Sequence, residues 1–295
     1  MANVHYGNIG DIWKHLLLSE VLAIEVPTAY WESHAGSSHY DLTHTPEREY
    51  GIFYFVHAAS QSEVLNGAVY TQLLKGYERD GLLKLYPGSP LLAMMVLQYH
   101  HATFLFCDTD PQSLATISED RVTAGLALDA VRVVQEDGIG TLARLLTSAD
   151  PEEMSDTFAH IDPYQPFAAN AEGTTAVEVF CELSLRGGKA MLWYGFDSAG
   201  GQAYIHKQLQ HAFQVHSFHP PVYRLWCGEV TLNAIHTPGY RFHPGVMGCG
   251  VILSNVSSPA LTACKQLGEA LEMVYASATL PHQQSGALSF SERIL

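Results

Sequence analysis

One short segment combines the residue types needed to hold an amino group. Residues 161–167 read Ile-Asp-Pro-Tyr-Gln-Pro-Phe, with one acid, two prolines and two aromatic rings. Asp162 follows a candidate strand, so its carboxylate and the carbonyl of Pro163 are expected at the carboxyl edge of a sheet. There they can accept hydrogen bonds from an amino group, while Tyr164 or Phe167 stacks on a ring or contacts a cation. The segment therefore predicts a reaction centre at a strand end.

Polar residues also follow other candidate strands. One strand ends at Asp108, and another ends at Asp137, which Gly138 follows. A carboxylate at a strand end can accept two hydrogen bonds from the hydroxyls of a ribose. An Asp-Gly pair suits contact with an adenine amino group and a close approach of the backbone. The residues that mark four predicted strand ends are His34, Asp108, Asp137 and Asp162.

The elements that must position these residues alternate along the chain. Apolar residues at helical spacing predict a helix over residues 11–25, and residues 49–80 predict a helical insertion. Alternating strands and helices indicate a mostly parallel, doubly wound α/β sheet, with sites at the carboxyl ends of its strands. We expect the last residues of the chain to be loosely ordered. Further predicted strands cover 28–32, 104–108, 131–138 and 189–194; predicted helices cover 139–147, 173–186, 201–213 and 259–277; and 221–256 is rich in β-forming residues.

The charge balance argues against a large nucleic-acid substrate. The 295 residues include 15 Lys and Arg against 30 Asp and Glu, a formal net charge of -15. Proteins that bind RNA or DNA normally carry a basic stripe, because phosphate contacts dominate their affinity. No run of Lys and Arg is visible here. The composition therefore favours a small-molecule substrate.

Other bulk features indicate a cytoplasmic protein. The five cysteines are odd in number and form no CxxC pair, which is typical of reduced, buried thiols. No secretory signal and no apolar run of membrane-spanning length are visible. We expect no metal site, because neither the adjacent pair His100 and His101 nor the other histidines have zinc-site spacing. The sequence indicates no oligomeric state.

Several motifs resemble a known family. They include His5-Tyr-Gly-Asn-Ile-Gly-Asp-Ile-Trp-Lys-His15, Glu32-Ser-His-Ala-Gly36, Tyr86-Pro-Gly-Ser-Pro90, Asp137-Gly138 and Asp162-Pro163. In this order they resemble the RlmJ-type methyltransferases, which methylate N6 of an adenine in large-subunit ribosomal RNA with S-adenosylmethionine (SAM). The resemblance implies a Rossmann-like class I SAM-dependent methyltransferase fold with a small helical insertion. It also implies a SAM-binding domain formed by 1–48 and 81–295 and an inserted helical subdomain at 49–80.

The same resemblance implies roles for individual residues. Lys14 and His34 would hold the methionine part of SAM, with Ser89 nearby. Asp108 would bind the ribose, and Asp137 with Gly138 the adenine side. Asp162 and Pro163 would face the reactive end. Each of these positions carries a suitable residue, although position 108 is Asp where the family pattern leads us to expect Glu.

The reaction centre departs from the family pattern. Adenine-N6 enzymes carry Asp-Pro-Pro-Tyr, in which carboxylate and carbonyl hold the amino group and the aromatic ring stacks on the flipped base. Here Tyr164 comes one position early, and Gln-Pro-Phe167 follows. Together with the negative charge, this change favours a small-molecule reaction.

Our main hypothesis from the sequence is cyclisation of SAM itself to azetidine-2-carboxylate, with release of 5′-methylthioadenosine. Asp162, Tyr164 and Phe167 would be the catalytic residues, with Asp162 or a backbone carbonyl accepting the proton of the SAM amine and the rings contacting the sulfonium. The alternative is adenine-N6 methylation of 23S rRNA, and a third hypothesis is a non-catalytic SAM- or nucleotide-binding protein. The sequence leaves open whether the nucleophile is the amine of SAM or an external group. It also leaves open whether residues 5–15 form a moving lid or a packed helix.

Overall fold

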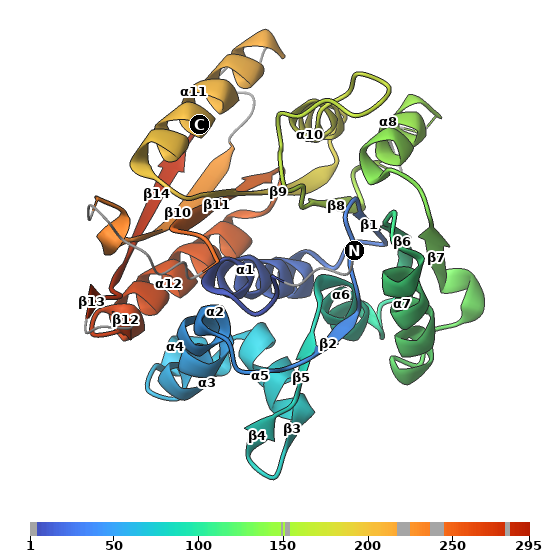
Figure 1. The fold of residues 1–295 in the computed structure, drawn as a ribbon. Helices are drawn as coiled ribbons and strands as arrows, with labels where there is room; N and C mark the ends of the chain where they lie inside the picture. Colours follow the sequence, from blue (N-terminus) through green and yellow to red (C-terminus); the bar gives the residue numbers. More distant parts are fainter. Residues whose placement is uncertain (1–4, 149, 151–153, 217–224, 237–244, 281–283) are drawn as a thin grey trace.

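An eight-stranded mixed sheet forms the centre of the protein (Figure 1). The computed structural model describes residues 5–148, 150, 154–216, 225–236, 245–280 and 284–295. Neighbouring strands from β7 to β9 are parallel, whereas β11 is antiparallel to both of its neighbours, and β14 is antiparallel to β10. In sheet order the strands are β14 (Leu288–Ile294), β10 (Trp226–Leu232), β11 (Gly248–Ser254), β9 (Lys189–Phe196), β8 (Thr157–Ile161), β1 (Ala29–Glu32), β6 (Thr103–Cys107) and β7 (Val131–Val134).

The strand order identifies the fold. Numbered along the chain, the first seven strands of this sheet lie in the order 3-2-1-4-5-7-6, and the seventh is antiparallel to its neighbours. This is the Rossmann-like arrangement of class I methyltransferases, so the predicted fold class is confirmed. The order reverses direction between β1 and β8, and a sheet of this kind binds ligands outside the carboxyl ends of the strands at such a point.

Helices cover both faces of the sheet (Figure 1). On one face α1 (Ile9–Glu25) packs against α6 (Ser89–Leu97) and α12 (Ser258–Tyr275), and α7 (Pro111–Thr123) contributes to the same hydrophobic core. A second core on the opposite face includes α8 (Gly138–Ser148), α10 (Ala176–Leu185) and α11 (Ala199–Val215). No helix in the described part of the chain is both long and apolar enough to cross a membrane.

A run of short helices follows β2 and precedes β5. These two strands pair with each other, and the helices between them pack against α1 and α12 through the core of that face. The division into a SAM-binding domain and an inserted subdomain stays a prediction. The elements of this region are β2 (His39–Asp41), α2 (Pro46–Arg48), the π-helical segment η1 (Glu49–Phe53), α3 (Tyr54–Ala59), α4 (Glu63–Gly67), α5 (Val69–Tyr77), β3 (Glu78–Arg79), β4 (Leu82–Leu83) and β5 (Leu85–Pro87).

The end of the chain differs from our expectation. Residues predicted to be loosely ordered include β14, which pairs along its whole length with β10. Leu288 is buried and Phe290, two residues further on, packs against the core, so the first part of β14 covers the core, whereas Ile294 is exposed. The β-rich stretch 221–256 contains β10 and β11, although 221–224 and 237–244 lie outside the described residues. The remaining short elements are η2 (Leu128–Ala130), η3 (Asn233–His236), β12 (Thr279–Leu280) and β13 (Gln284–Ser285).

Candidate active site

Three charged side chains lie at the centre of the candidate site. Lys14 belongs to α1, and its Nζ lies 2.6 Å from Asp162 Oδ2 and 3.1 Å from Asp11 Oδ1. The same ammonium lies 5.6 Å from the centre of the Trp193 ring. Only 9% of the Lys14 side chain is exposed. The two carboxylates therefore compensate a positive charge that burial would otherwise disfavour.

The electrostatics of the cluster keep Lys14 charged. Burial lowers the pKa of Lys14, but the charges of Asp162 and Asp11 outweigh this and hold the pKa above its usual value. Burial raises the pKa of Asp11, and the charge of Asp162 adds to the rise, while Lys14 opposes it. The site thus contains a permanent cation held between two acids, one of which sits directly after β8.

A small cavity of about 30 Å³ adjoins this cluster. It gathers side chains from α1, the loop after β1, the start of α6 and the end of β8, together with three tyrosine rings from other segments. Four of the predicted site residues line it: Lys14, His34, Ser89 and Asp162. Its volume suits one small polar group, since about 10–15 Å³ open to a water-sized sphere is enough to hold one water molecule. A larger ligand would extend from the cavity along the strand ends.

His34 presents a neutral ring at this site. Burial lowers the pKa of His34, and the carboxylates of Asp162, Asp108 and Asp137 offset this effect only in part. Nδ1 of the ring lies 2.8 Å from the hydroxyl of Ser33. A neutral imidazole can both donate and accept one hydrogen bond, so His34 can contact either kind of ligand atom.

Asp108 directly follows β6, which is the neighbour of β1 in the sheet. Its carboxylate holds the loop after β1 through a hydrogen bond. Its Oδ2 accepts a hydrogen bond from the Gly36 amide at 2.8 Å, and its Oδ1 accepts one from the Asp110 amide at 2.8 Å. Each carboxylate oxygen has a second lone pair. Asp108 can therefore keep these contacts and still accept hydrogen bonds from a diol.

Asp137 caps helix α8 beyond the end of β7. Its Oδ2 accepts hydrogen bonds from the Gly140 amide at 2.8 Å and from Asn170 Nδ2 at 2.6 Å. Burial raises the pKa of Asp137, but these hydrogen bonds outweigh it and leave the pKa below its usual value. At Gly138 an added Cβ would lie 1.8 Å from the Ser33 carbonyl oxygen. The predicted close backbone approach is therefore a contact between the loops after β7 and β1.

A buried polar network lies beneath the cavity. Ser89 Oγ donates to Glu32 Oε1 at 2.5 Å, and His160 Nδ1 lies 2.9 Å from the same oxygen. Tyr30 OH donates to Glu32 Oε2 at 3.0 Å. Glu32 and His160 are fully buried, and His160 Nε2 has no hydrogen-bond partner among the residues that the structure describes. No role for this pair was predicted from the sequence, where the available signal was an ionisable residue within each of two mainly apolar strands.

The aromatic residues after Asp162 do not line the cavity. Pro163 is buried, but 90% of Tyr164 is exposed. Phe167 is half-buried and packs against the core formed with α8, α10 and α11. The structure thus brings Asp162 to the cavity and leaves both rings outside it. Catalytic roles for Tyr164 and Phe167 stay predictions.

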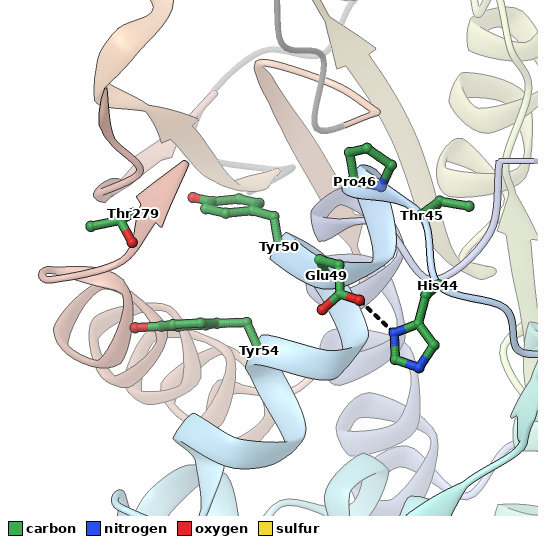
Figure 2. Close-up of a pocket in the computed structure, with 7 residues that line it drawn as sticks. All are labelled: His44, Thr45, Pro46, Glu49, Tyr50, Tyr54 and Thr279. Carbon is green, nitrogen blue, oxygen red and sulfur yellow. Dashed lines mark hydrogen bonds and ion pairs between the residues drawn. The ribbon is translucent and has the colours of Figure 1, made fainter. Parts of the chain in front are cut away.

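A larger cavity, of about 360 Å³, lies on the helical insertion (Figure 2). Tyr50, Tyr54 and Thr279 lie on one side of it, and His44 lies on the other, within hydrogen-bonding distance of Glu49. None of the predicted site residues lines this cavity. The candidate site is therefore at the strand ends, where the fold predicts it.

Comparison with known proteins identifies the family. Residues 25–212 match the family model described as ribosomal RNA large subunit methyltransferase D, RlmJ. The chain belongs to this family. The matched part includes every predicted site residue except Lys14.

One curated relative and one solved structure are similar to this chain. The ribosomal RNA large subunit methyltransferase J of Escherichia coli is 31% identical over 101 residues, which cover 32% of this chain and 36% of that protein. The match thus spans about a third of the curated relative. Protein LPL1258 of Legionella pneumophila superimposes with a TM-score of 0.73 at 22% identity, covering 98% of both chains. This likeness supports the fold over nearly the whole molecule.

The RlmJ family match changes the ranking of our hypotheses. It supports an RNA methyltransferase better than SAM cyclisation, and none of the comparisons supports the cyclase. The preference for a small-molecule substrate, based on net charge, gives way to a nucleic-acid substrate as the better-supported alternative.

Among the described residues, no group of three or more His, Cys, Asp or Glu side chains could hold a metal ion.

Proposed function

We propose that this protein transfers a methyl group from SAM to the N6 amino group of an adenine in large-subunit ribosomal RNA. The match to the RlmJ family over residues 25–212 carries this proposal. The name of the E. coli relative supports ribosomal RNA as the class of substrate. The Asp162-Pro163 pair at the end of β8 supports an amino group as the acceptor.

The strand-end residues fit SAM in their chemistry. Bound SAM would supply an electrophilic methyl group on a sulfonium. Lys14, which is permanently charged, and neutral His34 would hold the carboxylate and amine of the methionine part. Asp108 would accept hydrogen bonds from the ribose hydroxyls, and Asp137 with Gly138 would contact the adenine. His34, Asp108 and Asp137 follow the neighbouring parallel strands β1, β6 and β7, and an extended ligand along this edge of the sheet could reach all three.

Asp162 would act on the acceptor. Its carboxylate and the Pro163 carbonyl can accept the two N–H groups of an adenine amine, which fixes the direction of the nitrogen lone pair. Lys14 Nζ donates a hydrogen bond to Asp162 Oδ2 at 2.6 Å, so this oxygen already has one donor. The acceptor amine would share this carboxylate with Lys14 or use its other oxygen. Asp162 can also take the proton that leaves the nitrogen when the methyl group arrives.

The test combines two incubations. The full chain is given SAM labelled in its methyl group, once alone and once with unmodified large-subunit rRNA transcribed in vitro. The proposal expects label on adenine N6 and release of S-adenosylhomocysteine in the second incubation only.

Each other outcome counts against the proposal. Methylthioadenosine and azetidine-2-carboxylate formed without RNA, above the spontaneous rate, would support the cyclase hypothesis instead. SAM that binds but stays intact in both incubations would indicate a non-catalytic binding protein. Label on another RNA atom would exclude adenine N6.

A further inference from the structure

Arg48 is a buried cation that holds the N-terminal segment in place. It ends α2, and 6% of the residue is exposed. Its Nε donates to the Tyr6 carbonyl oxygen at 3.1 Å, and NH1 donates to the carbonyl and hydroxyl oxygens of Thr43 at 3.2 and 2.6 Å. The guanidinium carbon lies 3.7 Å from the centre of the Tyr6 ring. One side chain thus joins three segments of the chain.

Tyr6 is fixed on both faces of its ring. Arg48 covers one face, and Tyr40 stacks against the ring with centroids 4.4 Å apart and an interplanar angle of 15°. The Tyr6 hydroxyl donates to the Asp41 carbonyl at 2.7 Å. Tyr6 and Tyr40 line the same cavity as Lys14 and Asp162. Arg48 therefore supports a wall of the candidate active site without touching the cavity itself.

A chain of contacts leads from this wall to the reacting residues. Gly7 follows Tyr6, and its amide donates to Asp11 Oδ2 at 2.8 Å, while its carbonyl accepts from the Ile52 amide at 2.9 Å. Asp11 then contacts Lys14 through its other oxygen at 3.1 Å. Any movement of residues 6 and 7 would therefore alter how Asp11 directs Lys14 toward Asp162.

We infer that Arg48 is a positioning residue for methyl transfer: by holding Tyr6 and Gly7, it aims Lys14 at Asp162. This inference rests on the proposed function. A guanidinium is needed because it offers a flat face to the ring and several donors in fixed directions. Lysine keeps the charge but lacks both properties. A displacement of about 1 Å at a reacting group can lower a rate about 100-fold.

The experiment compares three variants with the wild-type chain. Arg48→Ala and Arg48→Lys remove the guanidinium, and Arg79→Ala removes an exposed cation elsewhere on the insertion, at the β3–β4 hairpin. The first two are expected to lower kcat for rRNA methylation about 10- to 100-fold. Affinity for S-adenosylhomocysteine should change by less than about fivefold, because most of its predicted contacts (His34, Asp108 and Asp137) follow β1, β6 and β7, whereas Arg48 contacts Tyr6 and Thr43. Arg79→Ala should match the wild type.

Hydrogen exchange gives a readout that does not depend on catalysis. The amides of Gly7 and Ile52 should exchange faster in both Arg48 variants, while the core strands stay protected. If Arg48→Ala does not fold, Tyr6→Leu removes the stacked ring but keeps the backbone carbonyl, and should give the same kinetic pattern.

The outcomes separate the two proposals. Wild-type activity in Arg48→Lys, or unchanged exchange at Gly7 and Ile52, would overturn the positioning role. An equal loss of kcat and of S-adenosylhomocysteine affinity would also overturn it, since that pattern indicates a general loss of structure. A wild-type chain that methylates no RNA would instead disprove the proposed function.

Discussion

Asp162 is the side chain on which the proposed chemistry most depends. Asp162→Asn keeps the size of the group but removes the charge that accepts protons and pairs with Lys14 at 2.6 Å. We expect kcat for rRNA methylation to fall by about 10²- to 10⁴-fold, the usual range for general acid–base groups. Affinity for S-adenosylhomocysteine should fall by less than about tenfold. Steady-state kinetics and titration calorimetry measure the two quantities.

A surface acid provides the control for this substitution. Asp129 lies in η2 and is exposed, so Asp129→Asn should leave both kcat and affinity unchanged. If Asp162→Asn lowers kcat and affinity by the same factor, Asp162 only binds SAM and takes no part in the transfer.

Lys14 has a structural effect that can be measured apart from activity. Lys14→Met leaves Asp11 and Asp162 close together and without their cation. Removing one partner from a buried ionic cluster costs about 3 kcal/mol or more of unfolding free energy. Urea unfolding at pH 8 measures the loss.

The pH dependence of this loss has a definite sign. The pKa of Asp11 is raised in the folded protein, and without Lys14 it would rise further. A raised pKa means that the folded state binds protons more tightly than the unfolded state, so the variant should regain stability as the pH falls from 8 to 5. In the wild type the pKa of Lys14 is raised; its contribution is complete below the unfolded pKa of about 10.4 and is lost only above it. A variant whose stability deficit stays constant between pH 8 and 5 would contradict this account.

At the scale of elements, Gly138 controls how closely two loops approach. An alanine Cβ there would lie 1.8 Å from the Ser33 carbonyl oxygen, so the backbone must move. We expect Gly138→Ala to destabilise the protein by about 3 kcal/mol, the upper part of the range for overpacking. Thermal and urea unfolding test this value.

Gly67 is the matched control for this substitution. It ends α4, and an added Cβ would meet nothing within 4 Å. Gly67→Ala should be neutral or stabilise the fold by up to about 1 kcal/mol, because alanine restricts the unfolded chain. If both variants lose the same stability, the contact with Ser33 is not the cause.

The sequence predicted the elements that repeat a regular pattern. The helix expected at 11–25 is α1, Ile9–Glu25, and the helix expected at 259–277 is α12, Ser258–Tyr275. β14 was missed because serine and charged residues alternate with its inward side chains, and its pairing depends on β10, far away in the sequence. The composition of a short segment does not indicate whether a strand distant in the sequence will pair with it.

The site was predictable where the fold itself gathers residues. His34 and Asp162 meet because β1 and β8 are parallel neighbours that end at the same edge, and α1 and α6 bring Lys14 and Ser89 to that edge. The motifs of all four residues were visible in the sequence. Glu32 and His160 were not assigned roles, because the sequence does not show which side chains contact a polar residue in an apolar strand. Without those contacts, a functional polar residue cannot be distinguished from one that is simply part of the buried core. The exposure of Tyr164 depends on the path of the loop after β8, which no periodic pattern indicates.

At the scale of the whole molecule, the net charge of -15 constrains how RNA can bind. Several cations in the described part of the chain are already paired with carboxylates: Lys14, Arg144, Arg186, Lys189, Lys265 and Arg293. These six are fewer than half of the 15 Lys and Arg, so the expected weak contact with phosphates rests mainly on the excess of acidic residues. Each phosphate contact contributes about 0.7–0.9 to the salt slope of log affinity. We expect a slope of magnitude below about 3 for rRNA binding between 50 and 200 mM salt.

Filter binding at four salt concentrations measures this slope. A steep slope, of magnitude about 6 or more, would mean that a concentrated basic surface exists and that net charge is a poor guide to this interface. Lys265→Ala is a suitable control, because Lys265 already contacts Glu292 and should not alter the slope.

The packing of α1 against α12 has a consequence for synthesis on the ribosome. These helices lie more than 200 positions apart in the sequence yet share one core, and the Ser257 amide donates to Glu25 Oε1 at 2.7 Å. The helix that carries Lys14 is synthesised more than 200 residues before this partner helix. Contacts this distant in the chain slow folding and leave apolar surface exposed meanwhile. A nascent chain stalled before α12 should therefore need chaperone protection that the completed chain does not.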